Sequence, residues 1–296
     1  MVSVSVCICA YNEERNIEHS VRSVYSQRTD GFEIAEVIVV SSGSTDRTDE
    51  IVTEMTKEFP SLVLIRQETR SGKNSAINEF LSVKKGSVSV LLNADNILRD
   101  ETSLYHIIRP FDDDKVGIVG GHPIPTNDPS TAIGFVVHMM WTKHHHVSMI
   151  RPNIGELVAF RNIDMLLPTN TQTDEAMIKM ELEKRGYRSV YAPDAVVLNR
   201  GPETVSDFIS QRARVIVGEE FFLEKHRYVI RSRDKGLLVD SVFGTVRDLG
   251  VHPFKMSFAV LLEIVSRLRA KEHMRNDGKD ISVWDRVGST KNVKKD

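Results

Sequence analysis

The sequence has little cysteine, no long apolar run and no excess of charge of one sign. Its two cysteines, Cys7 and Cys9, stand too close together for an unstrained disulfide, which excludes a disulfide framework and fits the reducing cytoplasm. No apolar run reaches the roughly 18 residues of a transmembrane helix and no signal peptide is visible, so we expect a cytoplasmic protein. The 39 Lys and Arg nearly balance the 41 Asp and Glu, which excludes a polybasic protein that coats nucleic acid.

The composition is that of an ordinary globular protein, with 41% hydrophobic and 27% charged residues in a chain of 296. The charge is unevenly spread, because residues 225–296 carry 16 Lys or Arg and 9 Asp or Glu, a balance of +7. Composition favours a solvated basic surface for this segment. The alternative is a segment that contacts anionic lipid or a negatively charged substrate.

Apolar runs and amphipathic stretches alternate along the first hundred residues. The apolar runs predict strands at residues 2–9, 37–40, 62–65 and 88–92, with helices between them. This alternation predicts a mostly parallel sheet covered by helices on both faces. The less regular remainder predicts strands at 116–119 and 155–160, and helices at 131–149, 173–185, 205–222 and 256–270.

Polar clusters follow four of the predicted strands, at residues 11–13, 41–46, 70–73 and 93–95. Parallel strands joined by right-handed crossovers end at one edge of the sheet, so these clusters are expected to line one crevice. A single cluster is ordinary loop chemistry, whereas four in series are what a nucleotide-binding crevice needs.

Six motifs follow one another along the chain. They are Ala10-Tyr11-Asn12-Glu13-Glu14, Gly43-Ser44-Thr45-Asp46, Gly72-Lys73 with Asn78, Asn93-Ala94-Asp95, Thr173-Asp174-Glu175 and Gln211-Arg212-Ala213-Arg214. Taken in this order, they resemble the motifs of family-2 glycosyltransferases with the GT-A fold. The resemblance covers roughly residues 2–220 and implies an α/β fold, a mostly parallel, doubly wound sheet flanked by helices. It implies a nucleotide-sugar-binding half at 1–98, an acceptor-binding half of the same domain at 99–225, and a helical C-terminal extension at 226–296.

The resemblance implies an enzyme that moves a single sugar from a nucleotide-sugar donor to an acceptor hydroxyl, with a metal ion and with inversion. The expected donor is a UDP-sugar, with a GDP-sugar as the alternative. The expected donor contacts are Ala10, Tyr11, Asn12, Glu13, Ser42, Arg70, Gly72, Lys73, Asn93, Ala94, Gln211 and Arg214. Ser41 and Ser42 replace two acids of the family, so Ser42 should bond the nucleotide base more weakly and less selectively. At Gly72 and Lys73 the alternative is an ordinary turn with solvated basic residues.

The Asp-x-Asp metal motif of the family corresponds here to Asn93-Ala94-Asp95. Asp95 keeps the position of the metal ligand, and Mg²⁺ or Mn²⁺ there would neutralise the diphosphate as the glycosidic bond breaks. Asn93 can hydrogen-bond a ribose but brings no charge, which predicts a weaker metal affinity. An isolated triplet of this kind would be interpreted as a turn after a strand.

The acids Asp174 and Glu175 open a predicted helix, and the resemblance implies that one of them takes the proton from the acceptor hydroxyl. Counting back from Gly186 favours Glu175 as this base, with Asp174 as the alternative; two acids in a first turn also suit the helix dipole alone.

Gln211 and Arg214 lie on one helical face and would hold the diphosphate and the acceptor. Val215 replaces a tryptophan of polymer-forming members, which favours addition of one sugar over processive synthesis.

Residues 144–146 are three consecutive histidines, a pattern that suggests a metal site. Neighbouring side chains on a helix point about 100° apart, so the three cannot bind one ion, and a partly exposed polar patch is favoured. One of these histidines could line the acceptor cleft. Glu156, which precedes an acceptor-side strand of the family, is a candidate acceptor contact.

An apolar stripe followed by basic residues marks the predicted helix at 256–270. The stripe consists of Phe258, Leu261, Leu262, Val265 and Leu268. This pattern is typical of a helix in the membrane interface, so residues 250–296 are a candidate peripheral contact with the inner face of the membrane and the acceptor a sugar or a lipid-linked acceptor. The helix is apolar nearly all round, however, which favours packing against the catalytic domain.

Two other functions compete with a working transferase. A catalytically impaired, glycosyltransferase-like protein that binds nucleotide or sugar would account for the departures at Ser41, Asn93 and Val215, but the acids and Arg214 remain. A nucleotidyltransferase needs a glycine-rich signature after the first strand, and this chain has residues 10–13 there instead.

Overall fold

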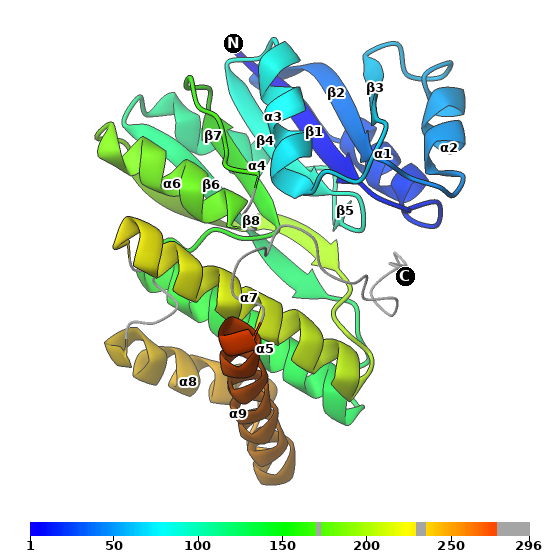
Figure 1. The fold of residues 1–296 in the computed structure, drawn as a ribbon. Helices are drawn as coiled ribbons and strands as arrows, with labels where there is room; N and C mark the ends of the chain where they lie inside the picture. Colours follow the sequence, from blue (N-terminus) through cyan, green and yellow to red (C-terminus); the bar gives the residue numbers. More distant parts are fainter. Residues whose placement is uncertain (170–172, 229–234, 277–296) are drawn as a thin grey trace.

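The computed structural model describes residues 1–169, 173–228 and 235–276 (Figure 1). The described strands form one sheet in the order β3-β2-β1-β4-β7-β6-β8-β5. The strands are β1 (Val2–Ala10), β2 (Phe32–Ser42), β3 (Leu62–Gln67), β4 (Val88–Asn93), β5 (Ile97–Leu98), β6 (Val116–Pro125), β7 (Leu157–Arg161) and β8 (Arg188–Asn199). The α-helices are α1 (Ile17–Tyr25), α2 (Thr48–Met55), α3 (Lys73–Val83), α4 (Ser103–Ile108), α5 (Ala132–Ile150), α6 (Asp174–Lys184), α7 (Val205–His226), α8 (Lys235–Leu249) and α9 (Pro253–Asn276).

The predicted α/β sheet flanked by helices is confirmed, and the sheet is mixed. Strands β1 to β4 pair in parallel, as the alternating pattern predicts. Strand β7 runs antiparallel to both of its neighbours, β4 and β6, in the middle of the sheet. The sequence predicted neither this direction nor strand β8, which pairs in parallel with β6.

Alternation along the buried strands gives the sheet an apolar core on each face. On β1, Val4, Val6 and Ile8 belong to the cluster shared with α1 and α2. Cys7 points to the opposite face, where it packs in the cluster shared with α3 and α6. The thiols of Cys7 and Cys9 lie 3.7 Å apart on the same face and are both free, as the spacing predicts. This core fixes the carboxyl ends of the strands, from which the polar loops emerge.

Helices α5, α7, α8 and α9 form a layer beneath the sheet (Figure 1). Helix α9 is joined to α7 by an ion pair between Arg212 and Glu263, with an N–O distance of 2.8 Å. The predicted stripe is not its packing face, because Leu262 is buried whereas Leu261 and Leu268 are exposed. The described ranges contain no helix of the length and apolar character needed to cross a bilayer.

Candidate functional site

Hydrogen bonds tie the loops after the first three strands together, as predicted. Asn12 adopts a left-handed backbone conformation, with φ of 55°, and its backbone N–H donates to Ser44 Oγ at 3.1 Å. The Asn12 side chain in turn accepts from the Thr45 N–H at 2.7 Å. Ser42 Oγ accepts from the Ser71 N–H at 3.0 Å. The three loops therefore form one connected edge of the sheet.

Two features bring the third loop close to the first two. The Arg70 guanidinium lies 4.3 Å from the centre of the Tyr11 ring, a cation–π distance. Gly43 allows the two loops to approach closely, because a Cβ at this position would lie only 2.6 Å from the backbone nitrogen of Arg70. Gly72, with φ of 84°, then turns the chain into α3.

Ala10 and Glu13 are buried within this edge. Glu13 Oε2 accepts from the Asn16 side chain at 2.9 Å, and the Glu13 N–H donates to Thr48 Oγ1 at 2.7 Å. Both hydrogen bonds are made within the protein, so Glu13 stabilises the conformation of the loop. Its predicted contact with the donor stays a prediction.

Lys73, the first residue of α3, reaches the acids at the start of α6. Its Nζ lies 2.7 Å from Asp174 Oδ2 and 3.0 Å from Glu175 Oε1. The sequence placed Lys73 near phosphate and did not predict this contact, which spans about a hundred residues. Although burial opposes it, the charges of Asp174 and Glu175 raise the pKa of the Lys73 ammonium well above its ordinary value.

The two acids have different surroundings. The Asp174 side chain is 3% exposed, and burial followed by repulsion from Glu175 raises its pKa to about 7. The Glu175 side chain is 23% exposed, and its pKa is lowered because the charge of Lys73 outweighs the effect of burial. Glu175 is therefore the acid that holds its negative charge.

The turn after β4 carries Asn93, the buried Ala94 and the half-buried Asp95. The side-chain amides of Asn93 and Asn96 both donate to Glu156 Oε2, at 2.8 and 2.9 Å. Burial and then the negative charge of Glu156 raise the pKa of Asp95 to about 6, while Lys73 and Arg214 oppose the rise. Asp95 and Glu156 are thus close enough to interact.

A cleft of about 290 Å³ opens beside these groups. It is lined by Glu156, Glu175, Arg214 and Val215, among others. Burial lowers the pKa of the Arg214 guanidinium, whereas the charges of Asp95 and Glu156 raise it. Asp174 does not line the cleft, and neither does Gln211, which is half-buried one turn before Arg214.

The three consecutive histidines are half-buried, in line with the expected partly exposed polar patch, and each contacts a different partner. His144 lines the cleft and contacts the Asn153 amide, with an N–N distance of 3.3 Å. The Nδ1 of His145 lies 2.8 Å from the Tyr191 hydroxyl, and the Nε2 of His146 lies 2.8 Å from Asp248 Oδ2 on α8. Burial, followed by neighbouring histidines, lowers the pKa of His144 and of His145 to about 4.

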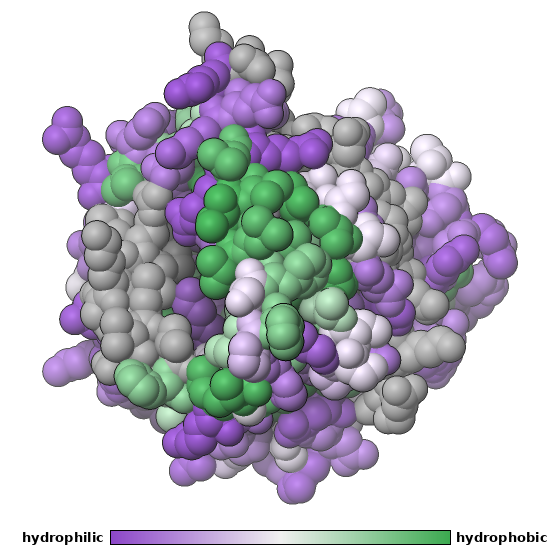
Figure 2. All heavy atoms as spheres, turned by 90° about the horizontal axis from the view of Figure 1, so that it is seen from below, coloured by the Kyte–Doolittle hydropathy of each residue, from purple (hydrophilic) through white to green (hydrophobic). Residues whose placement is uncertain are grey.

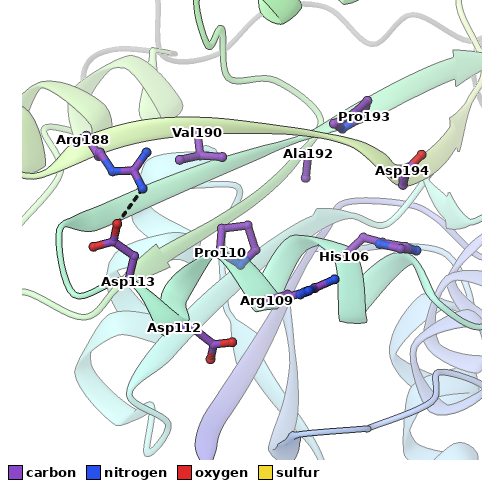
Figure 3. Close-up of a pocket in the computed structure, with 10 residues that line it drawn as sticks. All are labelled: His106, Arg109, Pro110, Asp112, Asp113, Arg188, Val190, Ala192, Pro193 and Asp194. Carbon is purple, nitrogen blue, oxygen red and sulfur yellow. Dashed lines mark hydrogen bonds and ion pairs between the residues drawn. The ribbon is translucent and has the colours of Figure 1, made fainter.

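A second cavity, of about 470 Å³, lies between α4 and β8 (Figure 3). Its wall includes an ion pair between Arg188 and Asp113, with an N–O distance of 2.7 Å. None of the residues that the motifs single out lines this cavity. We therefore place the candidate site at the cleft beside Glu175.

Comparison with protein families gives one match, to the model described as "Glycosyl transferase family 2", over residues 5–178. A curated relative is the poly-beta-1,6-N-acetyl-D-glucosamine synthase of Staphylococcus aureus, 25% identical over 229 residues. That alignment covers 71% of this chain and 53% of the relative, so the chain spans about half the length of the curated relatives it matches.

Two solved structures share the fold. One is a mannosyltransferase of Pyrobaculum calidifontis in complex with GDP-Man and Mn²⁺, with a TM-score of 0.66 and 21% identity over 93% of this chain and 88% of that one. The other is the glucosyl-3-phosphoglycerate synthase of Mycobacterium tuberculosis with Mn²⁺, UDP and phosphoglyceric acid. Its TM-score is 0.52, at 18% identity over 75% of this chain and 78% of that one.

Proposed function

The chain belongs to glycosyl transferase family 2, and from this we propose that it transfers a single sugar from a nucleotide-sugar donor to an acceptor hydroxyl, with a divalent cation and with inversion. The observation that carries the proposal is a cation ligand by type beside a cleft that an ionised carboxylate lines. Asp95, in the turn after β4, interacts with Glu156 and Arg214 of the cleft wall, and Glu175, at the start of α6, lines the same cleft. Transfer from a nucleotide sugar needs both charge neutralisation and proton removal.

Glu175 is the proposed general base. A base must first be able to reach the acceptor, and Glu175 lines the cleft whereas Asp174 is buried behind it. The pKa of about 7 for Asp174 would also fit a base, but burial keeps that carboxyl from an acceptor. Lys73 holds both acids, so it fixes the direction of the Glu175 carboxylate and keeps it deprotonated.

The residues around Asp95 fit Mg²⁺ or Mn²⁺. Carboxylate oxygens are ligands that these hard cations prefer, and Asp95 offers them at the strand edge. The described residues contain no group of three or more His, Cys, Asp or Glu side chains arranged to hold a metal. The cation would therefore take some of its ligands from the diphosphate, whose charge it would neutralise. The Mn²⁺ in the two similar structures supports this choice.

The proposed donor is a UDP-sugar or a GDP-sugar, the nucleotides named with the two similar structures. The loops after β1, β2 and β3, with Ser42 and the cation–π pair of Arg70 and Tyr11, would hold the nucleoside. Arg214 would face the diphosphate, because its charge interacts with Asp95. With Val215 in place of an aromatic platform, the cleft supports addition of one sugar rather than the growth of a polymer.

We propose further that the outward face of α9 contacts an anionic membrane surface, where a lipid-linked acceptor would be found. Seen from below, the molecule shows hydrophobic side chains gathered in one patch (Figure 2). The exposed large apolar side chains of α9 are Phe254, Val260, Leu261, Ile264, Val265 and Leu268. At about 100° per residue they occupy the face opposite the buried Ala259, Leu262 and Ala270.

Basic side chains border this apolar face. Arg267 and Arg269 lie on either side of it on the helical projection, and Lys271 and Arg275 follow towards the end of the helix. Apolar side chains bordered by basic ones are typical of a helix in the interface of an anionic bilayer. The face against α5 and α7 is already filled, so the helix is both packed and available to a membrane.

A thermal-shift screen tests the donor and the cation together. UDP, GDP, dTDP and CDP would each be added with and without Mn²⁺, and a ligand that binds the native state raises the melting temperature. We expect UDP or GDP to raise it, and Mn²⁺ to increase the effect. Release of nucleoside diphosphate from the matching nucleotide sugar would then identify a working transferase. Binding without any release would favour the catalytically impaired protein.

Liposome flotation tests the membrane contact. We expect the wild-type chain to float with anionic vesicles at low salt and to dissociate as the salt concentration rises. Leu261→Asp should abolish flotation, because a charge in the middle of the apolar face opposes insertion. Val83→Asp, which adds the same charge at an exposed position on α3, should float like the wild type. Flotation of Leu261→Asp at the wild-type level would refute the assignment.

A further inference from the structure

Glu156 stands directly before β7 and faces the turn that carries Asp95. Leu157 pairs with Leu92 in the antiparallel ladder of β7 and β4, so continuing that register by one residue places Glu156 opposite Asn93. The hydrogen bonds from Asn93 and Asn96 to Glu156 Oε2 hold the carboxylate at this place. Glu156 adjoins β7, a buried strand that pairs with both β4 and β6, so the strand pairing sets its place at the sheet edge.

We propose that Glu156 supplies, from β7, the carboxylate that Asn93 lacks, so that Asp95 and Glu156 together bind the divalent cation. The inference rests on the cation of the proposed function. It replaces the expectation that Glu156 contacts the acceptor.

The hydrogen bonds indicate that the negative charge expected at position 93 is carried here by Glu156. The family motif has an acid at position 93, and here an amide at that position donates to an acid from the neighbouring strand. An aspartate at 93 would lie against Glu156 and repel it, so an amide at 93 is what a carboxylate at 156 requires. Both amides use the same oxygen, Oε2, and neither of these two bonds uses Oε1. Oε1 would be the atom that binds the cation.

The backbone at Glu156 supports a functional role. Its φ of 52° lies in the left-handed region, which non-glycine residues rarely adopt. Such a conformation persists where the surrounding structure enforces it, and it is frequent where a side chain is aimed at a ligand. Here the strained residue carries a carboxylate, lines the cleft and interacts with Asp95.

The role as an acceptor contact is less well supported. Both amide donors of Glu156 come from the Asp95 turn, on the cation side of the cleft. Two negative charges placed this close together repel each other unless positive charge lies between them. Arg214 supplies part of that charge, and a divalent cation would supply the rest.

The test is a titration with Mn²⁺ in the presence of UDP and, separately, of GDP. The electron paramagnetic resonance signal of free Mn²⁺ measures how much of the ion is bound. We expect Glu156→Gln to weaken Mn²⁺ binding about tenfold or more. The double variant Asn93→Asp with Glu156→Gln returns the carboxylate to position 93, and it should recover binding to within about threefold of the wild type. Glu79→Gln removes an exposed charge from α3 and should bind Mn²⁺ as the wild type does.

The outcomes separate this inference from the proposed function. If the wild type binds no Mn²⁺ with either nucleotide, the proposed cation is wrong, and this inference falls with it. If the wild type binds Mn²⁺ and Glu156→Gln binds it within twofold of the wild type, only the role of Glu156 is overturned. A loss in Glu156→Gln that the double variant does not reverse also overturns it, because the carboxylate would then be needed for the structure alone.

Discussion

Removing the ammonium of Lys73 should raise the pKa of Glu175 and shift the activity to higher pH. In the wild type this one charge lies between two acids, 2.7 Å from Asp174 and 3.0 Å from Glu175. Lys73→Met keeps most of the side-chain volume and removes the charge. Asp174, with a pKa already raised to about 7, should then be protonated at neutral pH, whereas Glu175 faces the cleft and titrates there.

The size of the effect follows from the distance. Two unit charges 3.0 Å apart interact by roughly 1 kcal/mol in bulk water and roughly 5 kcal/mol at an effective dielectric constant of about 20. Each pKa unit corresponds to about 1.4 kcal/mol. The Lys73 side chain is 32% exposed, so solvent screens the pair and the lower part of the range applies. We therefore expect the pKa of Glu175 to rise by about one to two units when Lys73 is replaced by Met.

Carbon-detected NMR of the glutamate carboxyl groups measures this pKa without knowledge of the substrate. The Glu175 signal would be assigned by its absence in Glu175→Gln. Lys184→Met is the matched control, because it removes an exposed ammonium from the same helix, three residues from its partner Glu181. A pKa for Glu175 in Lys73→Met that stays within about 0.3 units of the wild-type value would refute the reasoning. The acidic limb of the pH–rate profile should move with the pKa once a donor is known.

Three further predictions concern the remaining groups. Asp95→Ala should abolish the Mn²⁺-dependent part of nucleotide binding in the thermal-shift assay while the protein stays folded, and unchanged Mn²⁺-dependent affinity would contradict its role. Glu175→Gln should lower turnover by about 10²-fold or more with little change in donor binding; if Asp174→Asn is inactive instead, the two acids exchange roles. His144 and His145 have pKa values of about 4 in the folded protein, against about 6.5 when exposed, so the unfolded chain binds more protons between these values. The free energy of unfolding, measured with urea, should therefore fall as the pH falls from about 6.5 towards 4, and His145→Gln should flatten that dependence.

The sequence predicts well that the loops after β1, β2 and β3 meet at one edge of the sheet, because this edge is built from local patterns. An apolar run followed by a polar cluster indicates the end of a parallel strand, and such ends share one edge of the sheet. The bonds of Asn12 to Ser44 and Thr45 and the stacking of Arg70 on Tyr11 are consequences of that shared edge. The sequence predicts which residues lie together at this edge, but it does not predict which of them contact each other.

The surroundings of Asp95 and Glu175 depend on pairings that no local pattern shows. Strand β7 enters the sheet antiparallel between β4 and β6, and this brings Glu156 to the Asp95 turn from about sixty residues away. Lys73 meets Glu175 because α3 and α6 pack on the same face of the sheet. The buried face of α9 could not be predicted from the sequence either. Its packing on α7 and α5 decides that Leu262 is buried and Leu261 exposed.

The charges at the cleft explain why a nucleoside diphosphate and a divalent cation would bind together. Glu156 and Glu175 line the cleft, and each has a second carboxylate next to it, Asp95 and Asp174 respectively. The positive charges that interact with these acids come from Lys73 and Arg214. A free diphosphate would be repelled by the two carboxylates nearest the β4 turn, and a cation at that turn reverses the local sign. Burial, and after it the negative charge of Glu156, raises the pKa of Asp95, and a cation bound beside it would lower that pKa. On the proposed function, a donor that binds together with its metal ion would therefore be favoured over a free nucleoside diphosphate.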